Sequence, residues 1–379
     1  MLSLQRKLNS RFSKNKLYWY SLHLLFGTNL KIITKLRERF KKVEEIFEAE
    51  PEELEKIGVK KEKVKMLVSR EIVAEAFRNL SEVYKKNYEV ITIGDEEYPD
   101  LLKEIYDPPI VIYCYGKKEV LNQPCIAIVG TRKPTPYGRA VAEKISSELA
   151  ERGLVIVSGL ARGIDSCAHR ASLNVGGNTI AVLGSGIDYV YPKENISLFK
   201  KIADSGAIIT EFPLGSPPHS FHFPIRNRII SGISLAVVVV EAAKRSGSLI
   251  TARLALEQNR EVMAVPGNVT SEYSYGANWL IKNGAKPVTS WEDIVEELPA
   301  PLKEEILLKE KEKKREIIKL SPEEERVLNV LKPDEKIHID VLSQKTDFSI
   351  SELLSILLNL ELKDMVIQHP GKYFQRKII

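Results

Sequence analysis

Residues 124–165 read PCIAIVGTRKPTPYGRAVAEKISSELAERGLVIVSGLARGID. Two short apolar runs, Ile126–Val129 and Leu154–Val157, stand on either side of a segment long enough for a helix. Neither run alternates with polar residues, which is typical of strands buried on both faces of a sheet. Each run is followed at once by a loop that contains glycine and arginine. The stretch therefore predicts a strand–helix–strand unit of a parallel sheet.

The same pattern continues to about residue 300. Apolar, β-branched runs alternate with helix-length segments, and further runs lie at Thr179–Leu183, Ala207–Ile209, Leu235–Val240 and Glu261–Val265. Such alternation predicts an α/β fold in which helices cover both faces of a parallel sheet. We therefore predict one Rossmann-like domain over residues 83–300, and Ile110–Tyr115 is predicted to add an edge strand before it.

The N-terminal segment differs in texture from the sheet region. Residues 1–82 carry apolar residues at helical spacing and are predicted to form an all-helical domain. Within it, Gly58 stands between two short helical segments. This glycine is either a residue that ends a helix or the turn of a helix-hairpin-helix module, where glycine lets the backbone approach a phosphate.

The C-terminal segment predicts a further small domain. Residues 301–320 are dense in charge and are predicted to be a linker, whereas residues 321–379 show regular elements again. Three helical segments precede two short strands there, near 322–331, 338–345, 349–363, Met365–His369 and Lys372–Arg376. Three helices and a β-hairpin predict a winged-helix domain.

Composition is that of a soluble globular chain of two to three domains. The 379 residues include 44% hydrophobic and 28% charged residues, which excludes a collagenous or wholly disordered chain. The formal net charge is +5. Residues 124–260 hold 16 basic and 10 acidic residues, so the positive charge is concentrated where the loops follow the predicted strands. An anionic partner is therefore expected at these loops.

The cysteines and the N-terminus bear on the compartment. Cys114, Cys125 and Cys167 form no C-x-x-C pair, which excludes a disulfide framework and a zinc site and predicts a reducing cytoplasm. The apolar run Leu17–Phe26 follows a basic start and loosely imitates a signal peptide. It is interrupted by polar residues and lacks a small-residue cleavage site, so no export signal and no membrane span are predicted.

The loops that follow the strands predict an anion pocket, because ligands of doubly wound sheets bind beyond the carboxyl ends of the strands. Glycine and serine at helix N-termini leave free N–H groups that attract anions. The loops that fit this description are Val129–Gly138, Ser158–Asp165, Gly184–Asp188, Tyr191–Lys193 and Ser246–Thr251. The basic residues in or near them are Arg132, Arg162, Lys193, Arg226, Arg228 and Arg245. Each glycine taken alone could instead mark only a tight turn, but together the loops predict a pocket for several phosphates.

Several enzymatic readings find little support. No G-x-x-x-x-G-K-[ST] motif is present, and the first strand ends in G-T-R rather than G-x-G-x-x-G, which argues against an ATPase and an NAD site. Asp165 and His169 could form an acid/base pair, but a helix-stabilising carboxylate and a packed histidine are the alternative. Cys167 is a nucleophile or a core residue. His219 and His222 have no third metal ligand in view. We predict no catalytic residue, no metal and no cofactor.

Aromatic residues near the loops have two readings. Tyr191, Phe212, Phe221 and Phe223 stand close in sequence to the predicted pocket. They could stack on unpaired bases, or they could pack in the core. Stacking on bases would add a sequence-tolerant contact to the phosphate contacts.

These motifs, in this order, resemble the DNA-processing protein A family (DprA, also called Smf). The motifs that carry the resemblance are VGTR (129–132), SGLARGID (158–165), YPKEN (191–195), TEFP (210–213), FPIRNRIISG (223–232), GSLITA (247–252) and VPGNVTSEYSYGANWLIKNGA (265–285). The helical N-terminus looks like the family's helix-hairpin-helix or SAM-like domain, and the tail looks like its winged helix. The resemblance covers nearly the whole central domain.

The resemblance implies a cytoplasmic protein that is not an enzyme. It implies binding and protection of single-stranded DNA, a homodimer formed through the Rossmann-like domain, and loading of the RecA recombinase during natural transformation. Carried over to this chain, the family's DNA-binding residues fall on Arg132, Gly159, Arg162, Gly163, Lys193, Arg226, Arg228, Ser248 and Thr251.

Two other functions fit the sequence less well. A phosphoribohydrolase would need a P-G-G-x-G-T-x-x-E loop, but Val265–Val269 lacks the second glycine and the glutamate. A transcription factor would read duplex DNA with the helix expected at Ser349–Lys363. That segment is dominated by Leu and Ile and carries Glu352 and Glu361, which favours a packing or protein-binding surface.

Overall fold

The computed structural model describes residues 12–27, 30–317, 320–363 and 365–377. The described chain divides after Leu298 into two compact units. The first contains helices and a large sheet, and the second contains a long helix and a small helical domain. The boundaries predicted from sequence at residues 82, 300 and 320 stay predictions.

A nine-stranded sheet forms the centre of the first unit, in the order β1-β2-β6-β5-β4-β3-β7-β8-β9. The strands from β6 to β9 in this order pair in parallel, whereas β1 and β2 pair antiparallel. The strands are β1 (Glu89–Thr92), β2 (Val111–Gly116), β3 (Cys125–Val129), β4 (Val155–Ser158), β5 (Thr179–Val182), β6 (Ala207–Thr210), β7 (Ala236–Val239), β8 (Glu261–Ala264) and β9 (Lys286–Pro287).

The predicted parallel strands are confirmed, and one prediction at the edge of the sheet is wrong. The six apolar runs chosen from sequence form β3 to β8. The run Ile110–Tyr115 forms β2, but β2 lies between β6 and β1, so β1 is the edge strand. Sequence reasoning missed β1 and β9 because both are short and begin with a charged residue, and β9 also contains a proline.

Helices cover both faces of the sheet, as the continuous apolar strands require. In β2, Val111 and Tyr113 enter one hydrophobic core, and Ile112 and Cys114 enter the other, because successive side chains of a strand point to opposite faces. The helices that follow β1 are α8 (Asp100–Lys103), η1 (Lys118–Asn122), α9 (Pro136–Glu151), α10 (Ile164–Asn174), η2 (Lys193–Asn195), α11 (Ile196–Ser205), α12 (His222–Gly232), α13 (Gly247–Glu257), η3 (Glu272–Ser274), α14 (Tyr275–Lys282) and α15 (Trp291–Val295).

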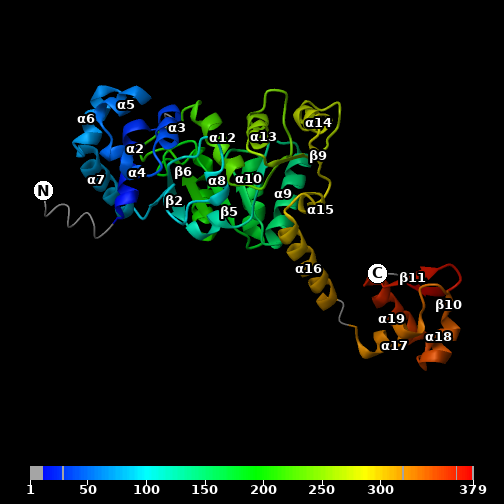
Figure 1. The fold of residues 1–379 in the computed structure, drawn as a ribbon. Coiled ribbons are helices and arrows are strands. Elements are labelled where there is room, and N and C mark those ends of the chain that lie inside the picture. The colour runs from blue at the N-terminus through cyan, green and yellow to red at the C-terminus, as the bar shows by residue number, and fades with distance from the viewer. Residues whose placement is uncertain (1–11, 28–29, 318–319, 364, 378–379) are drawn as a thin grey trace. The chain divides into compact units, whose positions relative to one another are not determined.

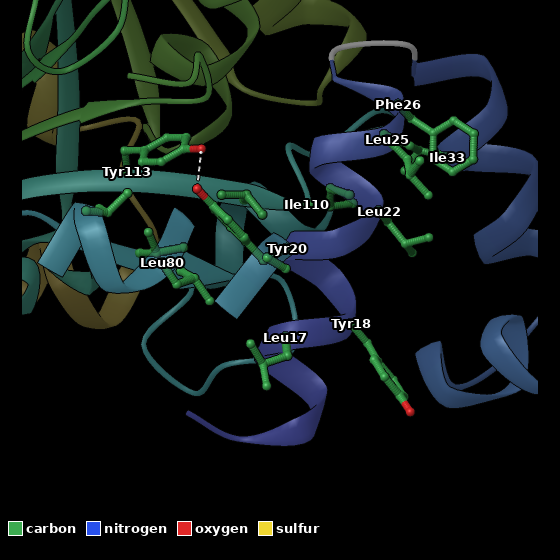
Figure 2. Packing of buried hydrophobic residues seen from close by; sticks show 14 of the residues in the cluster. Leu17, Tyr18, Tyr20, Leu22, Leu25, Phe26, Ile33, Leu80, Ile110 and Tyr113 are labelled. Carbon is green, nitrogen blue, oxygen red and sulfur yellow. Dashed lines mark hydrogen bonds between the residues drawn. The ribbon is translucent and has the colours of Figure 1, made fainter. Parts of the chain in front are cut away.

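Six helices in the described part of the N-terminal region (Figure 1) share one hydrophobic core with residues on one face of the sheet. They are α2 (Lys14–Phe26), α3 (Leu30–Arg39), α4 (Val43–Glu48), α5 (Pro51–Ile57), α6 (Lys61–Val68) and α7 (Glu71–Lys85). Figure 2 shows Tyr20 of α2 beside Tyr113 of β2, and their hydroxyls are 3.1 Å apart. Helix packing and one buried hydrogen bond thus tie the N-terminal helices to the sheet.

The apolar run Leu17–Phe26 lies in α2, where Leu17 and Leu22 are buried in this core. Its hydrophobicity is therefore explained by packing. The basic start of the run falls partly on residues 1–11, which lie outside the described residues. None of the helices described is long and apolar enough to cross a membrane.

The second unit contains α16 (Ala300–Ile317) and the winged helix that the sequence predicts. Most of the predicted linker is helix α16, and residues 318–319 lie outside the described residues. A three-stranded sheet of order β10-β12-β11 completes the domain. Its elements are α17 (Pro322–Val330), β10 (Ile337–His338), α18 (Ile339–Thr346), α19 (Ile350–Leu362), β11 (Val366–His369) and β12 (Tyr373–Arg376). These elements pack around their own hydrophobic core.

Candidate nucleic-acid interface

The chain order of the sheet reverses between β3 and β7. The strands β3 to β6 run to one side of this point, and β7 to β9 run to the other. Loops that leave neighbouring strands in opposite directions open a crevice beyond their carboxyl ends, which is where doubly wound sheets bind ligands. A cavity of about 700 Å³ lies here, between the loops that follow β3, β4 and β7 and the helix α12. We call it the anion pocket.

Three arginines line the anion pocket, namely Arg132 after β3, Arg226 on α12 and Arg245 after β7. Arg132 and Arg245 are exposed, so their guanidinium groups are available to a ligand. Arg226 is only 4% exposed. Burial lowers the pKa of Arg226 to about 10, so this side chain still carries a positive charge at neutral pH.

Backbone carbonyls hold Arg226 in place. Its Nη1 donates a hydrogen bond to the Gly159 carbonyl at 2.8 Å and another to the Val182 carbonyl, and its Nε donates to Asn227 Oδ1 at 3.2 Å. A Cβ atom on Gly159 would stand 2.5 Å from Nη2. The loop after β4 can therefore pass the guanidinium only because residue 159 is glycine. A fixed cation of this kind is already oriented before a phosphate arrives.

Aromatic rings share a wall with these cations. The guanidinium carbons of Arg132 and Arg226 lie 5.5 Å and 5.9 Å from the centroid of the Phe223 ring. The Tyr191 ring is 5.9 Å from Phe223. A smaller cavity adjoins the anion pocket, shares Arg132, Tyr191, Phe223 and Arg226 with it, and adds Arg162. Flat rings beside cations are suited to bases that follow a bound phosphate.

The N-terminus of helix α13 also faces the anion pocket. Ser246 caps this helix, and its Oγ is 2.8 Å from Oγ of Ser248. Ser248 and Thr251, which the resemblance assigns to DNA binding, line the cavity. Unpaired N–H groups and the helix dipole at such an end favour a negative charge.

Asp165 brings one carboxylate to the anion pocket, and the structure gives it a structural role. Its Oδ2 accepts hydrogen bonds from the backbone N–H groups of Gly159 and Ala161, at 3.1 and 3.3 Å. Burial raises its pKa, and the charge of Arg226 opposes this rise. Asp165 therefore shapes the loop after β4.

His169 and Cys167 are poorly placed for chemistry. Nδ1 of His169 is 2.7 Å from the Thr179 hydroxyl, and burial lowers the pKa of this histidine to about 3. All three cysteines are buried and free, and burial raises the pKa of Cys167. Among the described residues, no three His, Cys, Asp or Glu side chains gather in a group that could hold a metal ion. The structural readings of Asp165, His169 and Cys167 are the ones that fit.

Most of the predicted DNA-binding residues come together. Arg132, Gly159, Arg162, Arg226, Ser248 and Thr251 line the two adjoining cavities. Gly163 lines neither cavity; it has φ +78°, and a Cβ there would overlap the Thr131 carbonyl oxygen. Lys193 is exposed at the start of η2, next to Glu194, which pairs with Arg162. Lys193 lines neither cavity, although its neighbour Pro192 lines the smaller one.

Arg228 is placed differently from the prediction. It is 3% exposed, and it forms ion pairs with Glu211 at 2.6 Å and with Asp107 at 3.3 Å. Residues two apart on a helix do not share a face, so α12 turns Arg226 to the anion pocket and Arg228 into the core. The helical spacing of the R-N-R run was the signal that could have separated them. Asn227 stands between Arg226 and Arg228 in the sequence. It lines the anion pocket, and sequence reasoning missed it.

Comparisons with known proteins agree with this architecture. The family model described as DNA recombination-mediator protein A matches residues 89–299, and the model of the DprA winged helix domain matches residues 311–372. The DNA processing protein DprA of Bacillus subtilis (strain 168) is 46% identical over 223 residues, which make up 59% of this chain and 75% of that protein. Protein Smf of Escherichia coli (strain K12) is 40% identical over 288 residues, or 76% of this chain and 77% of that protein. The X-ray structure of DNA processing protein A from Streptococcus pneumoniae matches with a TM-score of 0.65 and 37% identity, covering 74% of this chain and 98% of that one.

Proposed function

Because the chain belongs to the DNA recombination-mediator protein A family, we propose that it binds single-stranded DNA in the anion pocket. The observation that carries this proposal is the convergence of Arg132, Arg226, Arg245 and the N-terminus of α13 on one cavity. Arginine forks match phosphate oxygens, and a helix N-terminus adds N–H donors.

The proposed binding mode uses phosphates for affinity and rings for the bases. Arg132, Arg245 and the first N–H groups of α13 hold consecutive phosphates, while Arg226 supplies a fixed positive charge beneath them. Bases stack on Tyr191 and Phe223. Such binding is largely independent of sequence and weakens with salt, with a log–log slope of roughly −0.7 per phosphate neutralised.

A single strand fits this pocket better than a duplex does. The cavity of about 700 Å³ has room for only a few nucleotides. A flexible strand can bend into it and expose its bases to the rings. A duplex keeps its bases stacked inside and is too wide to enter.

Fluorescence anisotropy with labelled oligo-dT and a duplex of equal length tests the proposal. Oligo-dT should bind much more tightly than the duplex, and Arg132→Ala should weaken oligo-dT binding by about tenfold, the effect of a lost charge-assisted hydrogen bond. Lys193→Ala should weaken it less, because Lys193 does not line either cavity. Arg253→Ala is the matched control, because Arg253 is exposed on α13, pairs with Glu257 and lies outside the pocket lining. Equal affinity for both DNA forms, or full affinity in Arg132→Ala, contradicts the proposal.

The wider role follows from the family and stays part of the proposal. In the cytoplasm, a homodimer formed through the Rossmann-like domain would protect incoming single strands and load RecA onto them during natural transformation, without catalysing a reaction. Light scattering of the purified chain measures its mass in solution. Nuclease protection of oligo-dT and RecA filament assembly on it, with and without the chain, test the other two activities.

A further inference from the structure

A second cavity of about 550 Å³ lies at the same edge of the sheet, beyond β3, β7 and β8. Its lining includes Thr135 and Tyr137 at the start of α9, Glu241 after β7, and Pro266 and Asn268 after β8. The volume is within the usual range for small-molecule sites. It contributes no residue to the anion pocket, and the proposed function gives it no role.

The chemistry of this cavity differs from that of the anion pocket. None of the described residues that line it is a lysine or arginine, and it contains the Glu241 carboxylate, an amide and several hydroxyls. A phosphate would be repelled by the carboxylate. A neutral ligand with N–H donors would be attracted to it instead.

Glu241 keeps acceptor capacity for such a ligand. Its Oε2 accepts a hydrogen bond from the Thr135 N–H at 2.9 Å, and its Oε1 accepts one from the Thr135 hydroxyl at 2.6 Å. An ionised carboxylate has about four lone-pair sites, so each oxygen can accept a second donor. The two existing hydrogen bonds fix the position of the carboxylate before any ligand enters.

A flat ligand is favoured by the walls. The Tyr137 ring is half-exposed, and its hydroxyl donates to the Pro266 carbonyl at 2.8 Å, which holds the ring at the mouth of the cavity. The loop after β8 is also held, because Asn278 exchanges two hydrogen bonds with the backbone of Gly267, at 3.0 and 3.1 Å. A fixed ring beside a fixed acceptor fits a nucleobase.

One loop, residues 131–135, contributes a lining residue to each of the two cavities. The N–H of Thr131, which lines the anion pocket, donates to the Glu241 carbonyl at 2.7 Å, while the Glu241 side chain lies in the second cavity. Thr135 follows Thr131 by four residues, a chain length that spans at most about 14 Å. A strand whose phosphate lies on Arg132 therefore brings a neighbouring base within reach of the second cavity.

We propose that the second cavity, between Tyr137 and Glu241, binds a base of the same DNA strand and prefers bases with an exocyclic amino group. Glutamate accepts a hydrogen bond from N4 of cytosine. Thymine presents carbonyl oxygens there, which the carboxylate repels. This proposal rests on the proposed function, because the anion pocket delivers the strand.

Anisotropy titrations of the full chain with oligo-dC and oligo-dT of equal length test it. Oligo-dC should bind roughly three- to tenfold more tightly, the effect of one net hydrogen bond. Glu241→Gln should remove this preference, because an amide accepts less strongly from N4 of cytosine than a carboxylate does and no longer repels the thymine carbonyls. Tyr137→Ala should weaken both oligonucleotides by about fivefold or more, because a stacked base is lost.

Controls separate this proposal from loss of the fold and from failure of the proposed function. Tyr106→Ala is the matched tyrosine control, because Tyr106 is exposed and outside the lining, and both affinities should stay unchanged. Circular dichroism checks each variant, and the exposed position of Tyr137 keeps the test decisive if Glu241→Gln fails to fold. Equal affinities of the two oligonucleotides, or a preference that survives Glu241→Gln, overturn the base site while the anion pocket stands. Failure of both oligonucleotides to bind overturns the proposed function and this inference together.

Discussion

At the scale of single residues, the function of an arginine in this chain depends on which carboxylates reach it. Arg226 is buried but meets backbone carbonyls and faces the anion pocket, whereas Arg228 is neutralised by Glu211 and Asp107. Arg162 is exposed, yet its guanidinium already forms an ion pair with Glu194. The residue types alone predicted a common role for all three, and only their neighbours separate them.

Glu194→Gln should tighten oligo-dT binding. The carboxylate of Glu194 pairs with Arg162, and the hydrogen bond from Arg162 lowers the pKa of Glu194. Glu194 therefore competes with an incoming phosphate for the guanidinium of Arg162. Removing its charge frees the guanidinium, and we expect an affinity gain of roughly two- to fivefold at low salt, which shrinks as salt screens the exposed pair. Anisotropy titrations at two salt concentrations measure this. Glu305→Gln, which breaks the exposed pair with Lys309, should change nothing.

Arg228→Met should destabilise the chain without impairing DNA binding. The buried carboxylate of Glu211 and the partly exposed carboxylate of Asp107 lose their cation, and loss of a buried partner typically costs about 3–5 kcal/mol at neutral pH. Burial raises the pKa of Glu211 and of Asp107, and Arg228 opposes both shifts. Without Arg228 these carboxyls bind protons more readily in the folded state, so the deficit should be largest at neutral pH and shrink as the pH falls toward about 5.

Thermal unfolding of wild type and Arg228→Met at pH 7.5 and pH 5 measures the deficit. Oligo-dT affinity of the folded variant should stay within about twofold of wild type. A large loss of affinity with unchanged stability would instead return Arg228 to the DNA-binding set.

At the scale of elements, the loops beyond the strands work as a set of close backbone contacts. The loop after β4 makes two close contacts. At Gly159 it approaches the guanidinium of Arg226, and at Gly163 it approaches the backbone of the loop after β3. Sequence predicted the buried strands, because a continuous apolar run identifies such a strand without any knowledge of its neighbours in the sheet. It could not predict which loop touches which, since these contacts arise from strand order, and the order β4-β3-β7 is set by the packing of the whole sheet.

Gly163→Ala should displace the loop that carries Arg132. The added Cβ would lie 2.7 Å from the Arg132 carbonyl carbon and would also strain a backbone with φ +78°. We expect oligo-dT affinity to fall by roughly tenfold, as for loss of a charged hydrogen bond. Gly153→Ala separates strain from displacement, because Gly153 has φ +82° but nothing within 4 Å of a Cβ. Its stability should fall by about 1–2 kcal/mol while its DNA affinity stays unchanged.

At the scale of the whole molecule, the chain contains two separately packed units. The sheet unit holds both cavities, and the winged helix has its own core. The exposed face of α19 carries Ile350, Leu354 and Leu358 rather than basic residues, which agrees with a protein-binding rather than a groove-reading tail. Sequence predicted the winged helix at the C-terminal end, because hydrophobic periodicity resumes after the charged stretch.

Truncation after Leu298 should leave the proposed DNA binding intact. The remaining unit keeps the sheet, the N-terminal helices and every residue of the anion pocket. Oligo-dT affinity of residues 1–298 should lie within about twofold of the full chain, because no basic residue of the pocket is removed. A loss of tenfold or more would show that the second unit takes part in binding.

The burial of all three cysteines makes the chain ready for site-specific labelling. Cys114 and Cys125 lie in strands, Cys167 lies in α10, and burial raises the pKa of each thiol, so thiol reagents meet little native thiolate. A cysteine introduced at the exposed Ser220, which lines the anion pocket, would react far faster than the native thiols. A fluorophore attached there would report the arrival of a strand in real time, with no prior removal of native cysteines.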